Sequence, residues 1–372
     1  MMIKIFELRI LVSLLFCFFC CIMHKNVIAK PFFYETQLFT GSNIYSYRIP
    51  GIIETDSGTL VAYCEKRKGV SDWADISIVC KRSNDNGKTW SKEILIADGH
   101  KTNHTINNPV MIADGKKIHL LYEVEYGLIS KGGGIFYSYT EDEGVSWHKP
   151  KRILEQHSEF NVFATGPGHG FKSSAGRLII PVWMVLKSEL QNEKSHHPGS
   201  VSTLYSDDHG VHWKLGEIVP SGKVVDPNES TILELTNGNF ILNIRNESRE
   251  KLRAVSYSKT GIDGWKSMSF DNDLPDPTCF GSLARYDKNT IMFINCNSKI
   301  KRENLTICVS GNEGKSWEIK KIVSQQGGYA DIIAGKKNIY VLLERVSKKN
   351  KTIFYSIYFN KCNLKWLKEN KE

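Results

Sequence analysis

The sequence predicts an all-β protein, a six-bladed β-propeller with Asp-box turns. We use "Asp box" for an eight-residue phrase of the form S-x-D-x-G-x-x-W, which recurs along the chain. Short alternating runs rich in Val, Ile, Tyr and Phe flank each copy, whereas helical spacing of apolar residues is rare. Self-similarity at a near-constant interval of this size is typical of repeat arrays and propellers.

Five copies of the phrase are recognisable, and their starting points lie 52 to 66 residues apart. Without residues 1–29, the 372-residue chain is long enough for six such intervals, which predicts six four-stranded blades. Thr140 replaces the serine in one copy, Asn312 replaces the aspartate in another, and the copy at Ser258 is degenerate. The copies are Ser83–Trp90, Thr140–Trp147, Ser206–Trp213, Ser258–Trp265 and Ser310–Trp317.

Each copy is predicted to be a turn between two strands. Around the first copy we expect strands at Ile76–Cys80 and Ile94–Ile96. The Ser and Asp side chains can bond nearby backbone N–H groups, Gly accepts a positive φ, and Trp anchors the hairpin. We therefore interpret the phrase as a structural turn at the blade rim without a part in chemistry. The segment Lys361–Glu372 is predicted to be a last strand followed by a solvated tail.

The N-terminus has the pattern of a secretory signal peptide. Lys4 and Arg9 precede an apolar run, Ile10–Met23, that is too short to span a bilayer comfortably. We predict a signal peptide at residues 1–29 and one propeller domain at residues 30–372. The protein is then secreted or periplasmic, with no membrane span after cleavage. The alternative is a membrane anchor made by an uncleaved leader.

The formal net charge of +9 suits an anionic ligand. The basic residues are scattered and no nucleic-acid-binding motif is present, so we expect no nucleic-acid partner. We expect the protein to be a monomer.

Cys64 and Cys80, and likewise Cys296 and Cys308, are expected on neighbouring strands, where export could oxidise them. Ordinary buried thiols are an equally open alternative. No cysteine spacing resembles a zinc site.

Four arginines stand in or beside strand-like apolar segments: Arg48, Arg67, Arg245 and Arg302. A buried guanidinium group must be paired. Several that converge on a propeller axis would need an anion, and a carboxylate fits best because it accepts two parallel hydrogen bonds. Taken singly, each arginine could equally form a surface ion pair.

The Tyr-Arg-Ile-Pro motif at Tyr47–Pro50, the Asp boxes and the later motifs together resemble the sialidases (neuraminidases). The resemblance is to the bacterial exo-α-sialidases of glycoside hydrolase family 33, and it extends from Tyr45 to Arg345. Asp boxes alone occur in unrelated propellers, so the combination carries the resemblance. It implies hydrolysis of terminal α-linked sialic acids on sialylated glycans, without a metal or cofactor.

The resemblance implies substrate-binding roles for four residues and a supporting role for a fifth. Arg48, Arg245 and Arg302 match the triad that binds the sialic acid carboxylate. Arg67 matches the contact to a sugar hydroxyl, and Glu344 matches the acid that holds the first arginine. Gly166–Gly170 resembles a structural loop of the family. Asn107, Asn108, Phe163 and Trp183 are expected either in the pocket lining or in the core.

The resemblance also implies three catalytic residues. Asp72 matches the acid/base, with Asp75 as its nearest competitor. Tyr329, after two glycines, matches the nucleophile, and Glu229 matches the acid that activates it. Most retaining glycosidases attack with a carboxylate, and sialidases are an exception that use tyrosine. A neutral phenol avoids repulsion from the substrate's own carboxylate, and it needs a base because an unperturbed Tyr has a pKa near 10.

Two other functions stay open at this stage. A trans-sialidase would transfer sialic acid to another sugar or to its own hydroxyl. A non-catalytic propeller would only bind sialic acid. The intact set of Asp72, Glu229 and Tyr329 counts against the second, because binding alone needs only the arginines.

Overall fold

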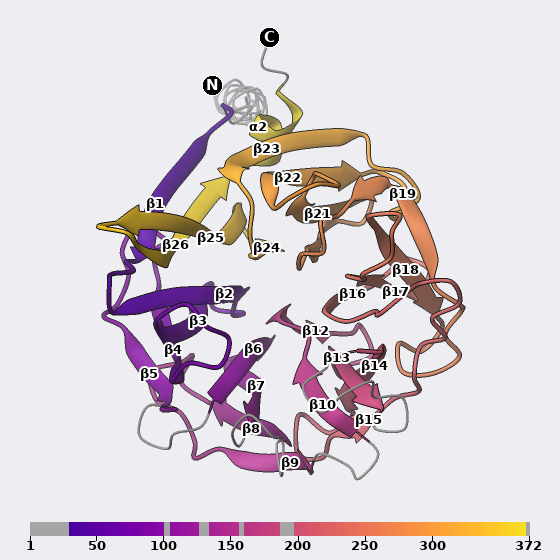
Figure 1. Cartoon of the computed structure of the whole chain (residues 1–372), viewed down its shortest axis with the longest axis horizontal. Coiled ribbons are helices and arrows are strands. Elements are labelled where there is room, and N and C mark those ends of the chain that lie inside the picture. The colour runs from indigo at the N-terminus through magenta and orange to yellow at the C-terminus, as the bar shows by residue number, and fades with distance from the viewer. Residues whose placement is uncertain (1–29, 100–104, 126–133, 156–159, 187–196, 370–372) are drawn as a thin grey trace, which may run out of the picture.

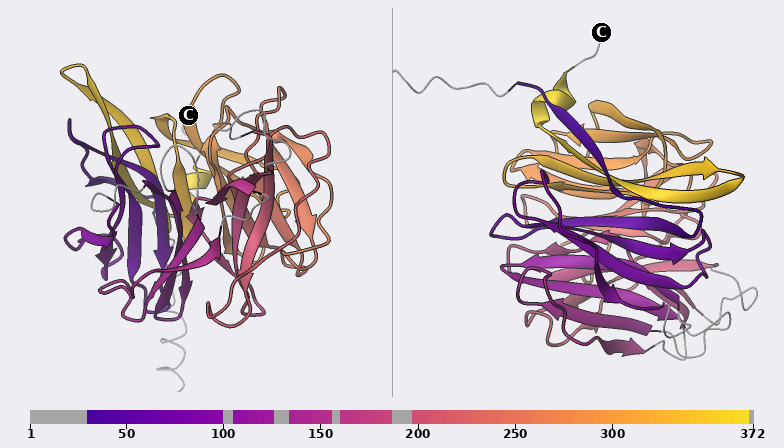
Figure 2. Two further views of the ribbon diagram at one scale, coloured as in Figure 1. Left: turned by 60° about the horizontal axis from the view of Figure 1, so that its bottom comes forward. Right: turned by 90° about the vertical axis from the view of Figure 1, so that its left-hand side faces the viewer.

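The computed structural model describes residues 30–99, 105–125, 134–155, 160–186 and 197–369. Six β-sheets stand around a central axis, so the predicted six-bladed propeller is confirmed (Figure 1). The side views show the blades as a stack of twisted strands (Figure 2). The predicted signal peptide lies outside the described residues. Within the described ranges, no helix is long and apolar enough to cross a membrane.

The blades follow one another along the chain. Blade 1 contains β2 (Tyr45–Glu54), β3 (Leu60–Lys68), β4 (Ile76–Ser83) and β5 (Ile94–Ala97). Blade 2 contains β6 (Thr105–Asp114), β7 (Lys117–Glu125), β8 (Gly134–Thr140) and β9 (Lys151–Glu155), with β11 (Gly168–His169) added parallel to β6. Blade 3 contains β10 (Phe160–Thr165), β13 (Leu178–Leu186), β14 (Gly199–Ser206) and β15 (Lys214–Leu215), with β12 (Phe171–Lys172) beside β13.

The second half repeats the plan. Blade 4 contains β16 (Ser230–Glu234), β17 (Phe240–Ile244), β18 (Leu252–Ser258) and β19 (Ser269–Pro275). Blade 5 contains β20 (Ser282–Asp287), β21 (Thr290–Cys296), β22 (Glu303–Ser310) and β23 (Ile319–Gln326). Blade 6 contains β24 (Ala330–Ala334), β25 (Ile339–Lys349), β26 (Thr352–Cys362) and, from the other end of the chain, β1 (Phe33–Phe39). The helix α2 (Leu364–Lys368) follows β26.

Strands from near the two ends of the described chain close the ring. Strand β1 pairs antiparallel with β26, so that Phe33 lies opposite Cys362. Both guanidinium nitrogens of Arg345, in the same blade, donate to the Glu35 carboxylate at 2.7 Å. The backbone ladder and this bidentate ion pair together hold the N-terminal strand on the outer edge of blade 6.

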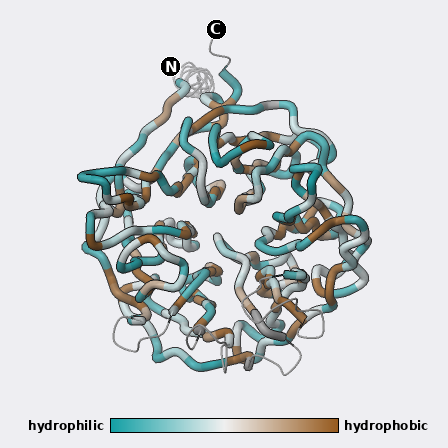
Figure 3. The backbone as a smooth tube through the Cα atoms, viewed as in Figure 1, coloured by the Kyte–Doolittle hydropathy of each residue, from teal (hydrophilic) through white to brown (hydrophobic). Residues whose placement is uncertain are grey.

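The hydrophobic core is a ring of interfaces between blades. Six buried clusters each combine apolar side chains of two neighbouring blades, one cluster for each of the six interfaces. Strand residues alternate between the two faces of a sheet, and both faces of a blade are covered by neighbours. The strands are therefore hydrophobic on both faces, and Figure 3 shows hydrophobic stretches within the blades.

Each Asp box forms the turn between the third and fourth strands of its blade. In the first box, Ser83 Oγ accepts from the Gly87 N–H at 2.9 Å, and Asp85 Oδ1 accepts from the Thr89 N–H at 2.9 Å. Gly87 has a φ of 76°, the left-handed conformation that glycine favours. In the box at Ser310–Trp317, Asn312 replaces the aspartate and makes the equivalent hydrogen bond: its side-chain oxygen accepts from the Ser316 N–H at 3.0 Å.

The way in which the ring closes explains why six blades contain five Asp boxes. In blade 6 the third strand is β26 and the fourth is β1 from the other end of the chain, so no turn joins these two strands. The five box tryptophans pack into the interface between their own blade and the preceding one. Blade 6 has no such tryptophan, and its interface with blade 5 is instead packed by Trp366 and Leu367 of α2.

The C-terminal prediction is wrong beyond Cys362, because α2 follows β26 in place of a solvated tail. Asn363 caps the helix, and its side-chain oxygen accepts from the Trp366 N–H at 2.9 Å. Trp366 stacks on Phe33 of β1 with 4.5 Å between the ring centres. These apolar anchors order the segment, although its many lysines suggested a solvated tail. Residues 370–372 lie outside the described part.

All six cysteines of the described residues are buried and free. Cys64 and Cys80 do lie on neighbouring strands, but Cys64 is opposite Val79, so the two side chains point to opposite faces of blade 1. Cys308 is opposite Phe293, three residues before Cys296, and these two side chains also diverge. The predicted pairing within each couple is therefore excluded by register.

A buried carboxylate, Asp331 on β24, links four blades at the axis. Its Oδ2 accepts from the Ile52 N–H of blade 1 at 2.9 Å. Its Oδ1 accepts from Ser282 Oγ of blade 5 at 2.6 Å and from His169 Nδ1 of blade 2 at 2.8 Å. The Gly166–Gly170 loop thus has a structural role. Gly168 has a φ of 80°, and a Cβ there would lie 2.8 Å from the Phe280 ring.

The His169–Asp331 pair predicts a pH-dependent contribution to stability. Burial lowers the pKa of His169, but the charge of Asp331 and the hydrogen bond to it together outweigh burial and raise the pKa overall above 6.5. A group whose pKa is raised on folding stabilises the fold fully below its unfolded value, and loses that contribution as the pH rises through the folded value. We expect His169→Gln to lower the free energy of unfolding by roughly 2 kcal/mol at pH 6 and by less at pH 9. Chemical denaturation at both pH values measures this, and equal losses would contradict it.

Candidate active site

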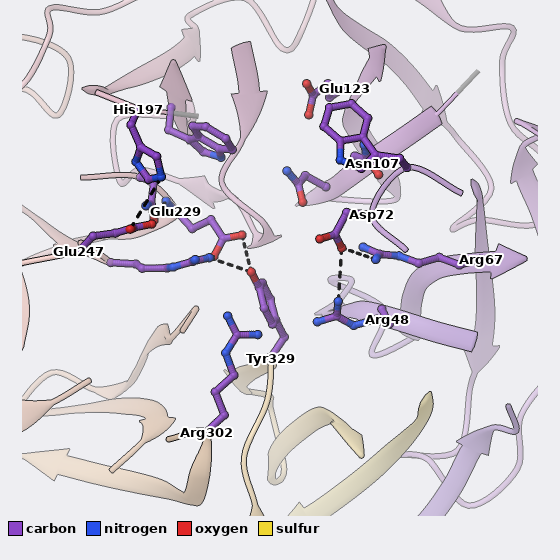
Figure 4. A pocket seen from close by; sticks show the side chains of 15 residues that line it. Arg48, Arg67, Asp72, Asn107, Glu123, His197, Glu229, Glu247, Arg302 and Tyr329 are labelled. Carbon is purple, nitrogen blue, oxygen red and sulfur yellow. Dashed lines mark hydrogen bonds and ion pairs between the residues drawn. The ribbon is translucent and has the colours of Figure 1, made fainter. Parts of the chain in front are cut away.

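One pocket of about 230 Å³ contains seven of the residues predicted from the sequence. They are Arg48, Arg67, Asp72, Glu229, Arg245, Arg302 and Tyr329. Blade 1 supplies the first three, blade 4 supplies Glu229 and Arg245, blade 5 supplies Arg302, and blade 6 supplies Tyr329. Figure 4 shows Asp72 with its two arginines on one side of the pocket, facing Glu229 and Tyr329 on the other.

Tyr329 and Glu229 form a short hydrogen bond. The Tyr329 hydroxyl donates to Glu229 Oε1 at 2.6 Å, and Arg245 Nη1 donates to the Tyr329 oxygen at 2.9 Å and to Glu229 Oε2 (Figure 4). Tyr329 stands directly before β24, and Glu229 directly before β16. The residues that immediately precede two inner strands therefore meet at the axis.

The surroundings keep the Tyr329 phenol protonated. Burial raises the pKa of Tyr329, and the Glu229 charge raises it further, while Arg245 and Arg302 act in the opposite direction. The phenol therefore holds its proton and shares it with the Glu229 carboxylate. The oxygen can become a nucleophile when that proton moves to Glu229.

Glu344 holds the Arg48 guanidinium group in place. Arg48 Nε donates to Glu344 Oε2 at 3.1 Å, and Nη2 donates to Oε1 at 2.9 Å. The same carboxylate accepts from the Tyr329 N–H at 3.1 Å, so one buried acid positions both the arginine and the tyrosine. Ile49 has a φ of 53°, rare for a β-branched residue, and lies in a bulge of β2. The bulge re-aims the Arg48 side chain at the pocket.

Asp72 lies on the loop between β3 and β4, and its side chain is 70% exposed. Arg67 Nη1 contacts Asp72 Oδ1, and Arg48 Nη1 reaches the same oxygen at 3.4 Å. Arg67 is itself held by Glu65, whose Oε2 accepts from Nε at 2.6 Å. Partial burial raises the pKa of Asp72, but the Arg67 and Arg48 charges outweigh it and lower the pKa overall. Asp75 is not among the residues that line the pocket.

Arg302 completes a group of three arginines around Tyr329. The Arg302 and Arg48 guanidinium carbons each lie 5.5 Å from the centre of the Tyr329 ring. Arg302 Nη2 donates to the Thr278 carbonyl oxygen at 3.0 Å, and it has no carboxylate partner among the described residues. Only Arg48 and Arg245 of the three are paired with acids. The group retains capacity for a further anion.

The pocket also holds residues that the sequence did not single out. Trp73, Glu123, His197, Asn228 and Glu247 line it together with the expected Asn107, Asn108 and Trp183. Phe163 is buried at 3% exposure and belongs to the core. Trp73 and Asn228 directly adjoin predicted site residues in the sequence, and this adjacency could have identified them as pocket residues. Glu123 and His197 come from segments without any such motif.

One group of the described residues has the composition of a metal site. Ligand atoms of His197, Asp226 and Glu247 lie within 4.8 Å of one another at the pocket edge. His197 Nδ1 is 3.3 Å from Asp226 Oδ2, and Nε2 is 3.8 Å from Glu247 Oε2. These separations equally suit direct contacts between the imidazole and the two carboxylates, and the chemistry derived below needs no metal.

A family model described as "BNR repeat-like domain" matches residues 58–341. The chain therefore belongs to the BNR repeat-like domain family, within which it is similar to sialidases. The exo-alpha-sialidase of Arthroderma benhamiae is 25% identical over 342 residues, which cover 80% of this chain and 77% of that protein. The sialidase of Micromonospora viridifaciens is 26% identical over 87% of this chain and 52% of its own length. The chain thus spans about half the length of this bacterial relative.

Solved structures share the fold. The Hadza microbial sialidase Hz136 matches with a TM-score of 0.73 at 21% identity, over 86% of this chain and 66% of its own. The intramolecular trans-sialidase from Ruminococcus gnavus matches with a TM-score of 0.73 at 17% identity, over 91% and 99%. The resemblance to sialidases that the motifs indicated is confirmed.

Proposed function

We propose that the protein is an exo-α-sialidase that releases terminal sialic acid from sialylated glycans with retention of configuration. The observation that carries the proposal is the 2.6 Å hydrogen bond from Tyr329 to Glu229 inside a group of three arginines. A phenol beside a carboxylate base suits attack on a carbon that itself bears a carboxylate. A relative in fold, the Trypanosoma rangeli sialidase, has been solved with 2,3-difluorosialic acid as a covalent intermediate.

The arginines bind and orient the substrate. Arg48, Arg245 and Arg302 neutralise the sialic acid carboxylate, which holds the adjacent anomeric carbon over the Tyr329 oxygen. Orientation of this kind removes much of the entropic cost of reaching the transition state. Because Glu344 already fixes Arg48, that guanidinium group loses little freedom on binding.

In the first step, the Tyr329 oxygen bonds to the anomeric carbon, and its proton passes to Glu229. The bond from that carbon to the glycosidic oxygen breaks, and Asp72 donates a proton to the leaving oxygen. In the second step, Asp72 as a carboxylate takes a proton from water, whose oxygen attacks the same carbon. Tyr329 leaves and recovers its proton from Glu229. Two displacements at one carbon retain the configuration.

Substrate binding prepares Asp72 for its role as an acid. In the free site, Arg67 and Arg48 favour the charged form of Asp72 and so lower its pKa. The substrate carboxylate neutralises part of the Arg48 charge and adds a negative charge nearby. Both changes raise the pKa of Asp72, so more of the acid is protonated once the substrate is in place.

Transfer of sialic acid is a second candidate function, because the Ruminococcus gnavus intramolecular trans-sialidase shares the fold over nearly its whole length. Both reactions use the same first step and differ in what attacks second. Product analysis with a galactoside acceptor separates them: hydrolysis yields free sialic acid, and transfer yields a new sialoside or an anhydro product.

The catalytic assignment is tested with an aryl α-sialoside. We expect the wild type to turn it over, Tyr329→Phe to lose about a thousandfold or more in kcat, and Asp72→Ala to lose roughly a hundredfold. Asp75→Ala is the matched control on the same loop and should stay near wild type. An inactive wild type refutes the enzyme proposal, whereas fully active variants refute the residue assignment.

The carboxylate-binding role is tested one arginine at a time. Arg302→Ala should lower kcat/KM more than tenfold, which is about 1.4 kcal/mol of transition-state binding, with partial recovery in Arg302→Lys. Arg177, which pairs with Asp207 on the blade 3 rim, serves as the control arginine. If Arg302→Ala lowered kcat/KM by less than tenfold, the proposed role of Arg302 in binding the substrate carboxylate would be contradicted.

The pKa change in Asp72 predicts a difference between two pH profiles. Asp72 must be protonated to act as an acid, and its pKa is lowered in the free enzyme and raised by bound substrate. With a sialylgalactoside, whose leaving group needs a proton, kcat/KM should therefore begin to fall at a lower pH than kcat. Steady-state kinetics between pH 3 and pH 8 show this. If kcat and kcat/KM fell over the same pH range on the basic side of their profiles, the proposed change in the pKa of Asp72 would be contradicted.

A further inference from the structure

We propose that Glu123, at the end of the pocket opposite Arg302, selects the substituent at C5 of the sialic acid. It favours an N-acyl group that ends in a hydroxyl (N-glycolyl) over one that ends in a methyl (N-acetyl). This selection rests on the proposed function and deepens it, because it names the kind of sialic acid that the site prefers. It depends on Asn107 and Glu123, which line the pocket but take no part in the chemistry derived above.

The arginines determine which part of the sugar faces this end of the pocket. The carboxylate and the reacting bond of sialic acid share one carbon, C2, so the arginines and Tyr329 together hold that side of the ring. In the six-membered ring C5 lies directly across from C2, and its substituent points away from the carboxylate. Figure 4 shows Asn107 and Glu123 on the opposite side of the pocket from Arg302. The C5 substituent is therefore the part of the substrate that meets these two residues.

Strand register places Asn107 and Glu123 side by side. Asn107 of β6 is directly opposite Glu123 of β7 in the antiparallel ladder of blade 2. Directly opposite residues carry their side chains on the same face of a sheet. Because both residues line the pocket, they form one polar wall.

A bulge in β6 is held by the same acid that holds Arg67. The ladder skips from Asn107 to Val110, and Asn108 between them has a φ of 51°. The Asn108 N–H donates to Glu65 Oε1 at 2.7 Å, and Arg67 Nε donates to Glu65 Oε2 at 2.6 Å. One fully buried acid thus fixes the wall relative to the catalytic part of the pocket before a ligand binds.

The wall presents hydrogen-bond acceptors to the ligand. The side-chain oxygen of Asn107 is buried and has no hydrogen-bond partner among the described residues. Glu123 is only 4% exposed. A carboxylate accepts at about four positions and donates at none, so Glu123 can accept a bond from a ligand whatever else it contacts. A buried acceptor that loses water to a group without a donor costs free energy.

An N-glycolyl group matches this wall better than an N-acetyl group does. Both groups have an amide N–H that can donate to the Asn107 oxygen. The glycolyl group also ends in a hydroxyl that donates to Glu123. The acetyl methyl instead displaces water from the acid without replacing its hydrogen bond, and a site built to bind a hydroxyl rejects the analogue that lacks it.

The relative turnover of two substrates tests the proposal. Aryl α-sialosides with one leaving group and either an N-glycolyl or an N-acetyl group at C5 are compared by kcat/KM. We expect the wild type to favour the N-glycolyl substrate by about tenfold, the size of effect expected for one hydrogen bond to a charged group. A wild-type ratio of one or less would overturn the proposal.

Variants of Glu123 assign the preference to this residue. Glu123→Leu should bring the ratio to about one, and Glu123→Gln, which keeps a neutral acceptor in nearly the same shape, should lie between. Glu141→Leu is the matched control, because this glutamate belongs to the same blade, has a 68% exposed side chain and is absent from the pocket lining. It should keep the wild-type ratio. If both Glu123 variants kept that ratio too, the proposal would be overturned. Both substrates are measured on one preparation, so a smaller folded fraction lowers both values alike.

Binding measurements separate this proposal from the proposed activity. If the wild type turned over neither substrate, the exo-sialidase proposal would fail, and the affinities of free N-glycolylneuraminic and N-acetylneuraminic acid would then be compared by titration calorimetry. Tighter binding of the N-glycolyl form, lost in Glu123→Leu, supports selection by this wall. Equal or weaker binding of that form overturns it.

Discussion

The structure depends most on one buried charge at the axis. Asp331 binds groups from blades 1, 2 and 5 while its own strand belongs to blade 6, and Tyr329 stands two residues before it. A carboxylate with no exposed surface is costly unless every lone pair is used. Its partners satisfy it only when the blades stand at the correct angle around the axis. The interaction that closes the centre of the fold therefore also places Tyr329.

The site itself is built from charges that restrain one another before any ligand arrives. Glu344 holds Arg48, Glu229 holds Arg245, and Asp72 is shared by Arg67 and Arg48. Arg302 alone of the three arginines rests on a neutral carbonyl. An incoming carboxylate thus meets one arginine without an acidic partner and two that are already in position. Little reorganisation is left for the binding step, which is the condition for electrostatic stabilisation of a transition state.

The sequence predicts the parts of this molecule that recur or that form local motifs. The Asp boxes set the blade count, and short motifs around Arg48, Asp72, Glu229, Arg302 and Tyr329 identify residues that four blades bring into one pocket. It does not reveal Glu123 or His197, because these residues enter the pocket through blade geometry and lie in no motif. It does not decide between disulfides and buried thiols for Cys64–Cys80 and Cys296–Cys308, because residues on neighbouring strands need not share a face. The C-terminal helix was missed because its apolar anchors are few and its lysines many.

The ring closure has a consequence for how the chain reaches its working form. Strand β1 is the first part of the propeller to be synthesised, and its partner β26 is nearly the last. The seven predicted residues in the pocket come from blades 1, 4, 5 and 6, which lie at opposite ends of the chain but adjoin in space. A growing chain can stack its first blades in order, yet it carries half of the site without the other half until its final strands exist. Closure of the propeller and assembly of the site are thus one event.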